Sequence, residues 1–149
     1  MSLAEMEKIR AIIEQYRQFK IKFIQFVKLC ELVISQQRLQ EIEVQRIDDA
    51  VMELKVMDAP MLVRFGILYK PDATPLGRID FLIHSPVESE PLYSLYFNQV
   101  GNILESVSDS FSNRRIHDEH DVPFVLHRFL QQYLRTLRLP ESATDKRES

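Results

Sequence analysis

The sequence has few of the residues that mark common sites of chemistry. It contains three glycines, one cysteine and no tryptophan among 149 residues. The scarcity of glycine argues against glycine-rich loops that hold phosphate groups, and no Cys-x-x-Cys pair is present. Cys30 has no partner for an internal disulfide, and the first residues lack the basic segment and apolar run of a signal peptide. We therefore expect a cytoplasmic protein.

Basic residues are not in excess along most of the chain. There are 19 Lys and Arg against 22 Asp and Glu, giving a formal net charge of -3. Residues 1–57 carry nine of each sign, residues 58–120 carry five basic and nine acidic, and residues 121–149 carry five and four. Nucleic acids bind concentrated positive charge, so we do not expect them as partners. The apolar runs are also far shorter than the roughly 18 residues that cross a bilayer, so no membrane is expected.

Length and overall composition are those of an ordinary globular protein. Hydrophobic residues make up 45% of the chain and charged residues 28%, both close to the globular average. A chain of this length matches one domain. We expect a single domain over residues 1–140, a flexible polar tail over residues 141–149, and no cofactor.

The first part of the chain has a long helical pattern. From residue 3 to about residue 35 there is no Gly or Pro, and apolar side chains recur at alternating steps of three and four. This spacing predicts one helix, roughly 45 Å long at 1.5 Å per residue. Its apolar seam consists of Ile9, Ile12, Tyr16, Phe19, Phe23, Phe26, Cys30 and Val33. Ile13, Val27 and Ile34 widen the seam, which indicates more than one packing neighbour.

One of these neighbours is expected to be a second helix. Apolar residues continue to recur near every 3.6 positions from Leu39 to Leu54, again without Gly or Pro. The pattern predicts a helical hairpin with its break near residues 35–38, and one continuous bent helix is the alternative. Pro60 ends the helical region, because proline cannot continue a helix.

The rest of the chain predicts strands and then a last helix. Apolar side chains alternate with period two in residues 61–69 and 78–84, and less regularly in residues 92–97. Short proline-containing connections favour an antiparallel meander covered on one face by helices. Residues 98–120 favour mixed structure, and residues 122–138 are expected to form an amphipathic helix. The predicted fold is α+β, with a long N-terminal helix packed on a small antiparallel sheet of about three strands, and a C-terminal helix.

Residues 117–121 contain the densest group of possible metal ligands. The sequence His-Asp-Glu-His-Asp offers two imidazoles and three carboxylates. If this segment is helical, His117 and His120 share a face, and His84 or His127 could complete a metal site. Zinc motifs follow tighter spacing rules, so a solvated linker is the competing interpretation. Acid/base catalysis by the same carboxylates has only proximity in the sequence behind it.

The first helix has more apolar width than a small sheet and short helices can cover. We interpret the front part of its seam as an interaction surface for a homodimer. This surface consists of Ile9, Ile12, Tyr16, Phe19, Phe23 and Phe26. Burial under the C-terminal helix is the competing interpretation. Cys30 lies in the same seam and is interpreted as a small core residue rather than a nucleophile.

Two functions follow from these observations. The favoured one is a small non-catalytic protein, a homodimeric protein-interaction or regulatory module whose partners are a second copy of itself and another protein. The alternative is a small-ligand or metal-binding protein that uses His117 and His120 with a pocket lined by the aromatic residues of the seam.

Overall fold

A computed structural model of the chain describes residues 1–48, 50–87 and 90–137. Six strands form one antiparallel sheet in the order β1-β2-β3-β4-β5-β6, with a helix before and after them. The α+β class, the long first helix and the C-terminal helix are thereby confirmed. The elements are α1 (Leu3–Gln36), β1 (Ile42–Asp48), β2 (Val51–Val56), β3 (Ala59–Tyr69), β4 (Pro75–Ile83), β5 (Tyr93–Phe97), β6 (Ile103–Leu104) and α2 (Val122–Leu137).

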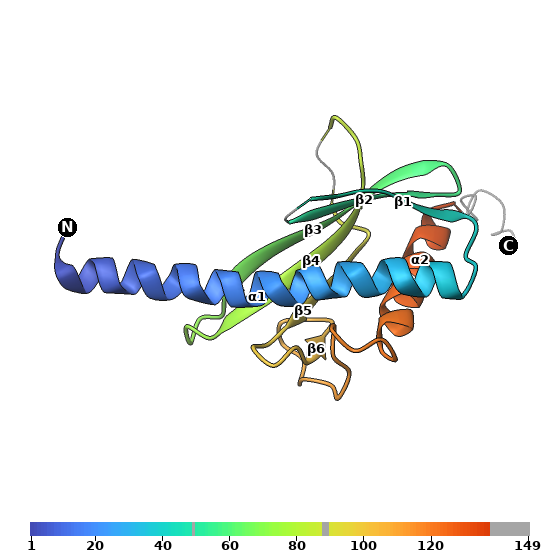
Figure 1. The fold of residues 1–149 in the computed structure, drawn as a ribbon. Helices are drawn as coiled ribbons and strands as arrows, with labels where there is room; N and C mark the ends of the chain where they lie inside the picture. The colour runs from blue at the N-terminus through green and yellow to red at the C-terminus, as the bar shows by residue number, and fades with distance from the viewer. Residues whose placement is uncertain (49, 88–89, 138–149) are drawn as a thin grey trace, which may run out of the picture.

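Helix α1 is longer than the sheet that it covers. Its 34 residues span about 50 Å at 1.5 Å per residue. Figure 1 shows that α1 runs along the sheet and that its N-terminal part extends beyond the sheet into solvent. The predicted end of the helix near residues 35–38 is confirmed, because α1 ends at Gln36.

Two predictions for the middle of the chain are wrong. Residues 39–54, expected to form the second helix of a hairpin, contain β1 and part of β2, and the sheet has six strands rather than about three. Every second side chain from Met52 to Val56 is buried, as a half-covered strand requires. The β2–β3 turn places Met57 and Asp58 at positive φ. Gly and Asn are the usual signals of such a turn, and neither occurs there.

The remaining predicted elements lie close to their expected places. The three predicted strands correspond to β3, β4 and β5, and the last helix corresponds to α2. Residues 98–120, where mixed structure was expected, contain the short strand β6 and several turns. The predicted tail at residues 141–149 lies outside the described part of the chain.

The core lies between one face of the sheet and both helices. Phe81 of β4 stacks on Phe129 of α2, with ring centroids 4.7 Å apart. The same ring meets Phe26 of α1 edge-on at 6.4 Å. Phe23 of α1 stacks on Phe65 of β3 at 5.4 Å. Because α1 and α2 contact the same side of β4, they cover the same face of the sheet, and these aromatic contacts hold the two layers together.

Gly77 allows the ring of Phe97 to lie directly against β4. The two residues are opposite each other in the β4–β5 register. Phe97 is fully buried and packs on Phe19 at 5.5 Å and Phe65 at 6.4 Å. A Cβ atom at position 77 would overlap this ring, which its neighbours hold in place. Gly66 of β3 differs, because no atom lies within 4 Å of the Cβ position there.

We expect Gly77→Ala to lower the free energy of unfolding by about 2 kcal/mol, because overpacking forces the core to shift. Gly66→Ala is the matched control, since the same methyl group enters open space on the neighbouring strand. The control should leave stability unchanged or raise it by roughly 0.5 kcal/mol, because glycine loses more backbone entropy on folding. Urea unfolding followed by circular dichroism measures both variants. Equal losses in the two would contradict this account of the Phe97 contact.

Candidate functional site

Helix α1 begins with a complete capping box. Ser2 Oγ accepts a hydrogen bond from the backbone N–H of Glu5 at 3.1 Å, and Glu5 Oε1 accepts one from the backbone N–H of Ser2 at 2.8 Å. These bonds satisfy N–H groups that have no partner within the helix. They also lower the pKa of the Glu5 carboxyl. The start of α1 is therefore stabilised locally, although it lies far from the sheet.

The structure divides the predicted interaction surface into a covered and an exposed part. Three members are at most 1% exposed and belong to the core: Phe19, Phe23 and Phe26. Ile9 and Ile12 are 44% and 48% exposed. Tyr16 lies at the boundary, where its half-buried ring is 5.5 Å from the ring of Phe65. Only the part of the surface before Tyr16 is accessible to a partner.

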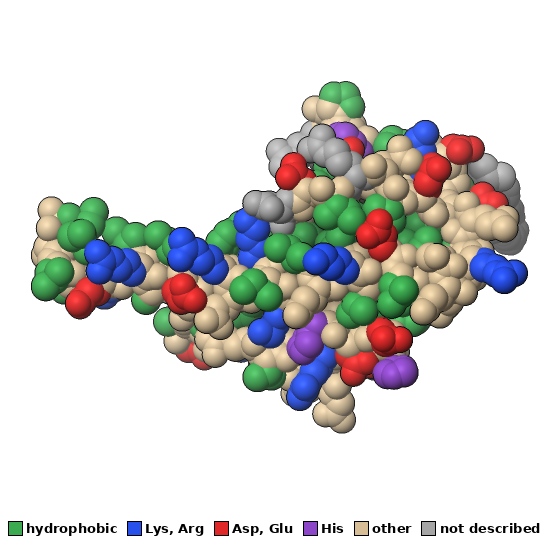
Figure 2. All heavy atoms as spheres, in the orientation of Figure 1, with side chains coloured by type: hydrophobic (Ala, Val, Ile, Leu, Met, Phe, Trp, Pro, Cys, Tyr) green, Lys and Arg blue, Asp and Glu red, His purple; other side chains and the backbone are tan. Residues whose placement is uncertain are grey.

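Beyond the sheet, α1 exposes a row of large apolar side chains. We call residues 2–16 the α1 tip, and we call Met6, Ile9, Ile12 and Ile13 the apolar ridge. These four side chains are between 40% and 48% exposed and share one face of the helix. Figure 2 shows apolar side chains gathered along the upper edge of the projecting helix, with charged side chains on its front.

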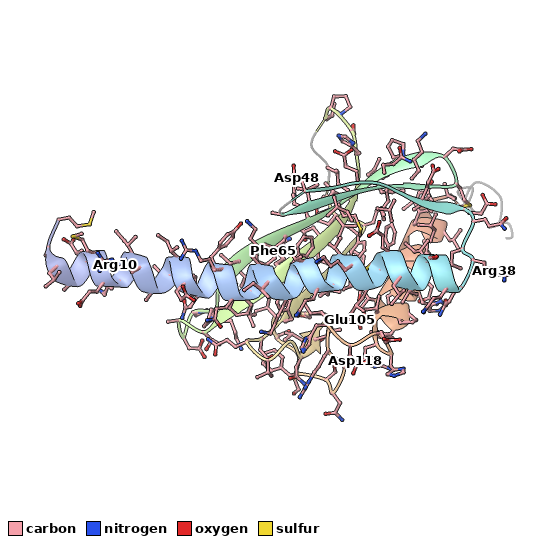
Figure 3. All side chains as sticks on the ribbon, in the orientation of Figure 1. Arg10, Arg38, Asp48, Phe65, Glu105 and Asp118 are labelled. Carbon is pink, nitrogen blue, oxygen red and sulfur yellow. The ribbon has the colours of Figure 1, made fainter. Side chains whose placement is uncertain are left out.

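The ridge continues the face of α1 that packs on the sheet. Ile9, Tyr16 and Phe23 are spaced by seven residues and so lie nearly in line along the helix. Tyr16 and Phe23 both contact Phe65 of β3, whereas Ile9 lies beyond the sheet. Figure 3 shows the labelled Arg10 on the projecting part and Phe65 beside the covered part of the helix. A contiguous exposed apolar surface of this kind marks an interaction site more often than scattered apolar residues do.

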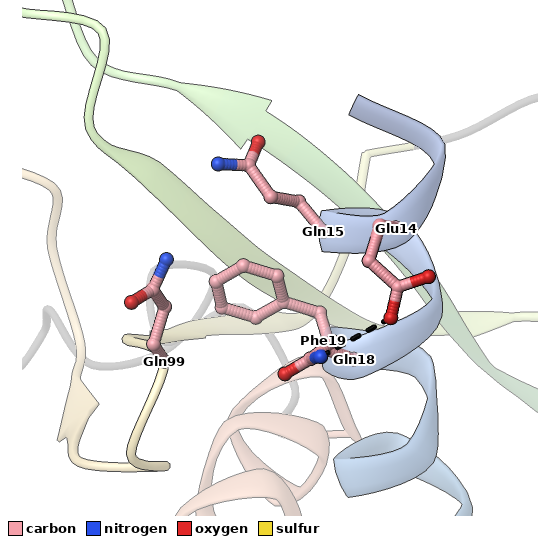
Figure 4. A pocket seen from close by; sticks show the side chains of 5 residues that line it. All are labelled: Glu14, Gln15, Gln18, Phe19 and Gln99. Atoms are coloured by element: carbon pink, nitrogen blue, oxygen red, sulfur yellow. Dashed lines mark hydrogen bonds between the residues drawn. The ribbon is translucent and has the colours of Figure 1, made fainter. Parts of the chain in front are cut away.

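A small hollow lies at the base of the α1 tip. It has a volume of about 240 Å³ and is lined by Glu14, Gln15, Gln18, Phe19 and Gln99 (Figure 4). Gln18 Nε2 donates a hydrogen bond to Glu14 Oε2 at 3.2 Å, and Gln15 Oε1 accepts one from the hydroxyl of Tyr69 at 2.8 Å. Three of its four polar side chains thus already bond to neighbours, and its volume of about 240 Å³ lies below the roughly 300 Å³ at which ligand pockets begin.

The structure does not assemble the predicted metal ligands. Residues 117–121 form turns rather than a helix, so His117 and His120 do not share a helical face. His117 is half-buried, whereas His120, His84 and His127 are exposed. Within residues 1–48, 50–87 and 90–137, no group of three or more His, Cys, Asp and Glu residues is placed to hold a metal ion.

The carboxylates of the same segment hold its turns. Asp118 Oδ1 accepts a hydrogen bond from the backbone N–H of His120 at 2.9 Å, and Asp121 Oδ2 accepts one from the backbone N–H of Arg115 at 2.9 Å. Cys30, the other candidate for chemistry, is fully buried, and this burial raises the pKa of its thiol. A thiol in this environment does not form the thiolate that nucleophilic attack needs.

His117 packs tightly against the backbone. Its ring lies on Gly101, which has φ +90°, and a Cβ atom there would overlap the imidazole. The buried Nδ1 atom has no hydrogen-bond partner among the residues that the structure describes. Desolvation, with smaller contributions from the positive charges of Lys22 and Arg115, lowers the pKa of His117. Burial of this ring therefore favours the neutral form of the imidazole.

A charged network joins α2 to β5. Arg128 donates hydrogen bonds from Nε and Nη2 to the two oxygens of Glu105 at 2.8 and 3.2 Å, and the Tyr93 hydroxyl donates another at 2.7 Å. The bond from Arg128 is the main cause of the lowered pKa of Glu105. Burial, followed by the bond to Glu105, raises the pKa of Tyr93. The Glu105 carboxylate accepts hydrogen bonds from both Arg128 and Tyr93. The network therefore holds α2 in place and does not present a general base.

A second network lies on the outer face of the sheet. Asp80 is 8% exposed and accepts hydrogen bonds from Arg78 Nε at 2.9 Å and Ser94 Oγ at 2.6 Å. Arg64 Nη2 lies 3.8 Å from its other oxygen. Sequence reasoning missed both networks, because their members meet through strand register and helix packing. The alternation of β3 and β4 was the one available signal, since it places Arg64 and Asp80 on the outward face.

Comparison with protein-family models, curated proteins and solved structures gave no match to this chain. No helix in the described part of the chain is long and apolar enough to cross a membrane. Among the described surfaces, the apolar ridge is the strongest candidate functional surface, because its four large apolar side chains are exposed side by side on one helix.

The stability of the fold should depend on the protonation of His117. Its pKa in the folded chain is lower than the ordinary value of 6.5, so the unfolded chain takes up a proton first as the pH falls. The contribution of neutral His117 to the free energy of unfolding is fully present above pH 6.5. It is lost as the pH falls through the folded-state pKa. We expect His117→Gln to flatten this pH dependence in urea unfolding. The exposed His120→Gln is the control, and a wild-type slope in both variants would refute the assignment.

The Glu105 network should contribute measurably to stability. Glu105→Gln keeps the size of the side chain but removes the charge that Arg128 and Tyr93 bind, so we expect a loss of about 1 to 2 kcal/mol in the free energy of unfolding. Glu119→Gln, at an exposed carboxylate, should change stability by less than about 0.5 kcal/mol. Thermal and urea unfolding measure both variants, and a neutral Glu105→Gln would show that the network is dispensable.

Proposed function

We propose that this chain is a non-catalytic, cytoplasmic protein-interaction or regulatory module that self-associates through the apolar ridge of the α1 tip. The observation that carries the proposal is the exposure of Met6, Ile9, Ile12 and Ile13, each between 40% and 48%, on a helix that projects beyond its own core. The capping box at Ser2 and Glu5 supports a helical tip that is formed before a partner arrives.

The shape of the ridge favours a protein partner over a small molecule. Ligand sites are concave and enclose most of the ligand surface, whereas a single helix presents a convex edge. An apolar helix edge is buried efficiently against a groove or another helix, where side chains of the two surfaces interdigitate. The hollow at the base of the tip does not include any ridge residue in its lining.

The charge of the tip favours a second copy as this partner. Together with the adjoining Arg17, which lies 3.7 Å from Glu14, the tip contains three acidic and three basic side chains, so two tips can approach without net repulsion. An isologous contact buries both ridges at once. Four ridge side chains offer less area than the roughly 800 Å² per partner of a typical stable complex, so we expect a dimer that dissociates on dilution.

A different protein partner would find its surface on the outer face of the sheet. Arg64 and Arg78 are 44% and 40% exposed there, on either side of the nearly buried Asp80. Exposed guanidinium groups can pair with the carboxylates of a different protein. Pairing of two tips would leave this face of both copies open.

The ligand-binding alternative has less geometric support. Phe19, an aromatic residue of the seam, does line the hollow at the base of the tip, but His117 and His120 do not. The histidines and the hollow therefore do not combine into one site in the described structure.

Light scattering across a wide range of protein concentration tests the proposed self-association. The wild-type mass should rise from 17.6 kDa toward twice that value. Ile9→Asp should remain monomeric because a carboxylate in the interface would be desolvated. Ile21→Asp is the matched control, since Ile21 is 57% exposed on the same helix but points about 120° away from Ile9. A wild-type mass that stays at 17.6 kDa at every concentration would refute the proposal.

A further inference from the structure

The face of α1 that carries the apolar ridge is occupied by the chain's own sheet further along the helix. Tyr16 and Phe23 pack on Phe65 of β3, with ring centroids 5.5 and 5.4 Å apart, and Phe26 packs on Phe81 of β4. Helix α1 is continuous from Leu3 to Gln36. A partner helix that lies along the ridge therefore reaches the edge of the sheet where the covered part of α1 begins.

This arrangement excludes a parallel pair in which two α1 helices lie side by side. In such a pair, the second helix would run beside the first over its full length. Its residues beyond the tip would then need the space that β3 and β4 already fill against Phe23 and Phe26. An antiparallel partner meets the sheet with the capped start of its helix at Ser2 and Leu3. Only the two tips then need to overlap.

We infer that two copies pair through their α1 tips in antiparallel orientation, about a two-fold axis level with Arg10. This inference rests on the proposed self-association. The spacing of apolar residues along the tip is nearly symmetric about Arg10, as a two-fold contact requires. Opposite each other in the pair are Ile9 and Ile12, Met6 and Ile13, and Leu3 and Tyr16, each taken from different copies.

The length of the exposed ridge agrees with this register. With the axis level with Arg10, the partner's Leu3, where its helix starts, comes level with residue 17, next to Tyr16, where the contacts of α1 with the sheet begin. Tyr16, which packs on Phe65 at this edge, then has one face on its own sheet and lies opposite the exposed Leu3 of the other copy. The tip is therefore just long enough to be covered by a second tip.

A head-to-tail contact is the competing arrangement. At the far end of α1 lies an apolar hollow of about 460 Å³, lined by Leu39, Ile42, Val56, Met57, Leu130 and Leu134 together with three polar residues. A tip placed in the hollow of the next copy would form a contact that propagates instead of closing. The nearly symmetric spacing of the ridge favours the closed pair, and the two arrangements give different masses.

Disulfide cross-linking between variants that each carry one introduced cysteine tests the orientation. Cys30 is fully buried and does not compete. In the antiparallel pair, Met6→Cys and Ile13→Cys lie opposite each other in different copies. Two copies of the same variant place their thiols about 12 Å apart along the axis for position 6 and about 9 Å for position 13, at 1.5 Å per residue. Both separations exceed the Cα–Cα distance of about 4.4 to 6.8 Å that a disulfide spans.

We expect the mixed variants, under mild oxidation, to form at least about tenfold more covalent dimer than either variant alone. Met6→Cys mixed with Ile21→Cys is the control for random collision, because Ile21 lies on another face of the helix. Circular dichroism confirms that each variant is folded. Cross-linking of each variant alone would establish a parallel pair and overturn the inference.

The remaining outcomes separate the orientation from the proposed function. If the mass doubles but the mixed variants form no cross-link, the antiparallel register about Arg10 is wrong, whereas self-association stands. Growth beyond two copies would overturn the closed pair in favour of the head-to-tail contact. A mass of 17.6 kDa at every concentration would remove the proposed self-association itself.

Discussion

The packing of aromatic side chains of α1 against the sheet is the interaction on which the rest of the structure depends. Phe23 stacks on Phe65 of β3. Phe81 of β4 packs edge-on against Phe26 and stacks on Phe129 of α2. These contacts fix the position and direction of α1. Because α1 is a single straight element that is longer than the sheet, fixing its covered part also fixes the tip as a projection into solvent (Figure 1). The projecting surface is a consequence of core packing.

The exposed tip has an energetic consequence for the isolated chain. Full burial of a large apolar side chain stabilises a protein by about 1.5 to 3 kcal/mol, and the four ridge residues are each left almost half exposed. An association that covers the ridge recovers part of this free energy in both copies, and the loss of translational and rotational freedom offsets much of it. The expected result is a weak, concentration-dependent pair whose outer sheet faces stay available, which suits a regulatory module.

The elements with one strong period could be predicted from the sequence, and those with an ambiguous period could not. Helix α1 and strands β3 and β4 have clear spacing, whereas the alternation in β5 is less regular. Residues 39–54 fit a helix as well as two strands, and the turn at Met57 lacks the residues that usually mark it. Within the seam, Ile9 and Phe23 are equivalent positions of a seven-residue spacing, and only the extent of the sheet decides which one is buried. The partners of Glu105 lie on β5 and α2 and meet it only in the folded chain.

The central claim is that one face of α1 is covered by the sheet in its second half and by a second copy at its tip. Amide hydrogen exchange, compared at low and high protein concentration, tests this claim most directly. The account predicts that protection of residues 5–16 rises with concentration, while protection of residues 19–34, which contain the buried Phe23 and Cys30, stays the same. Equal exchange of residues 5–16 at both concentrations would contradict it.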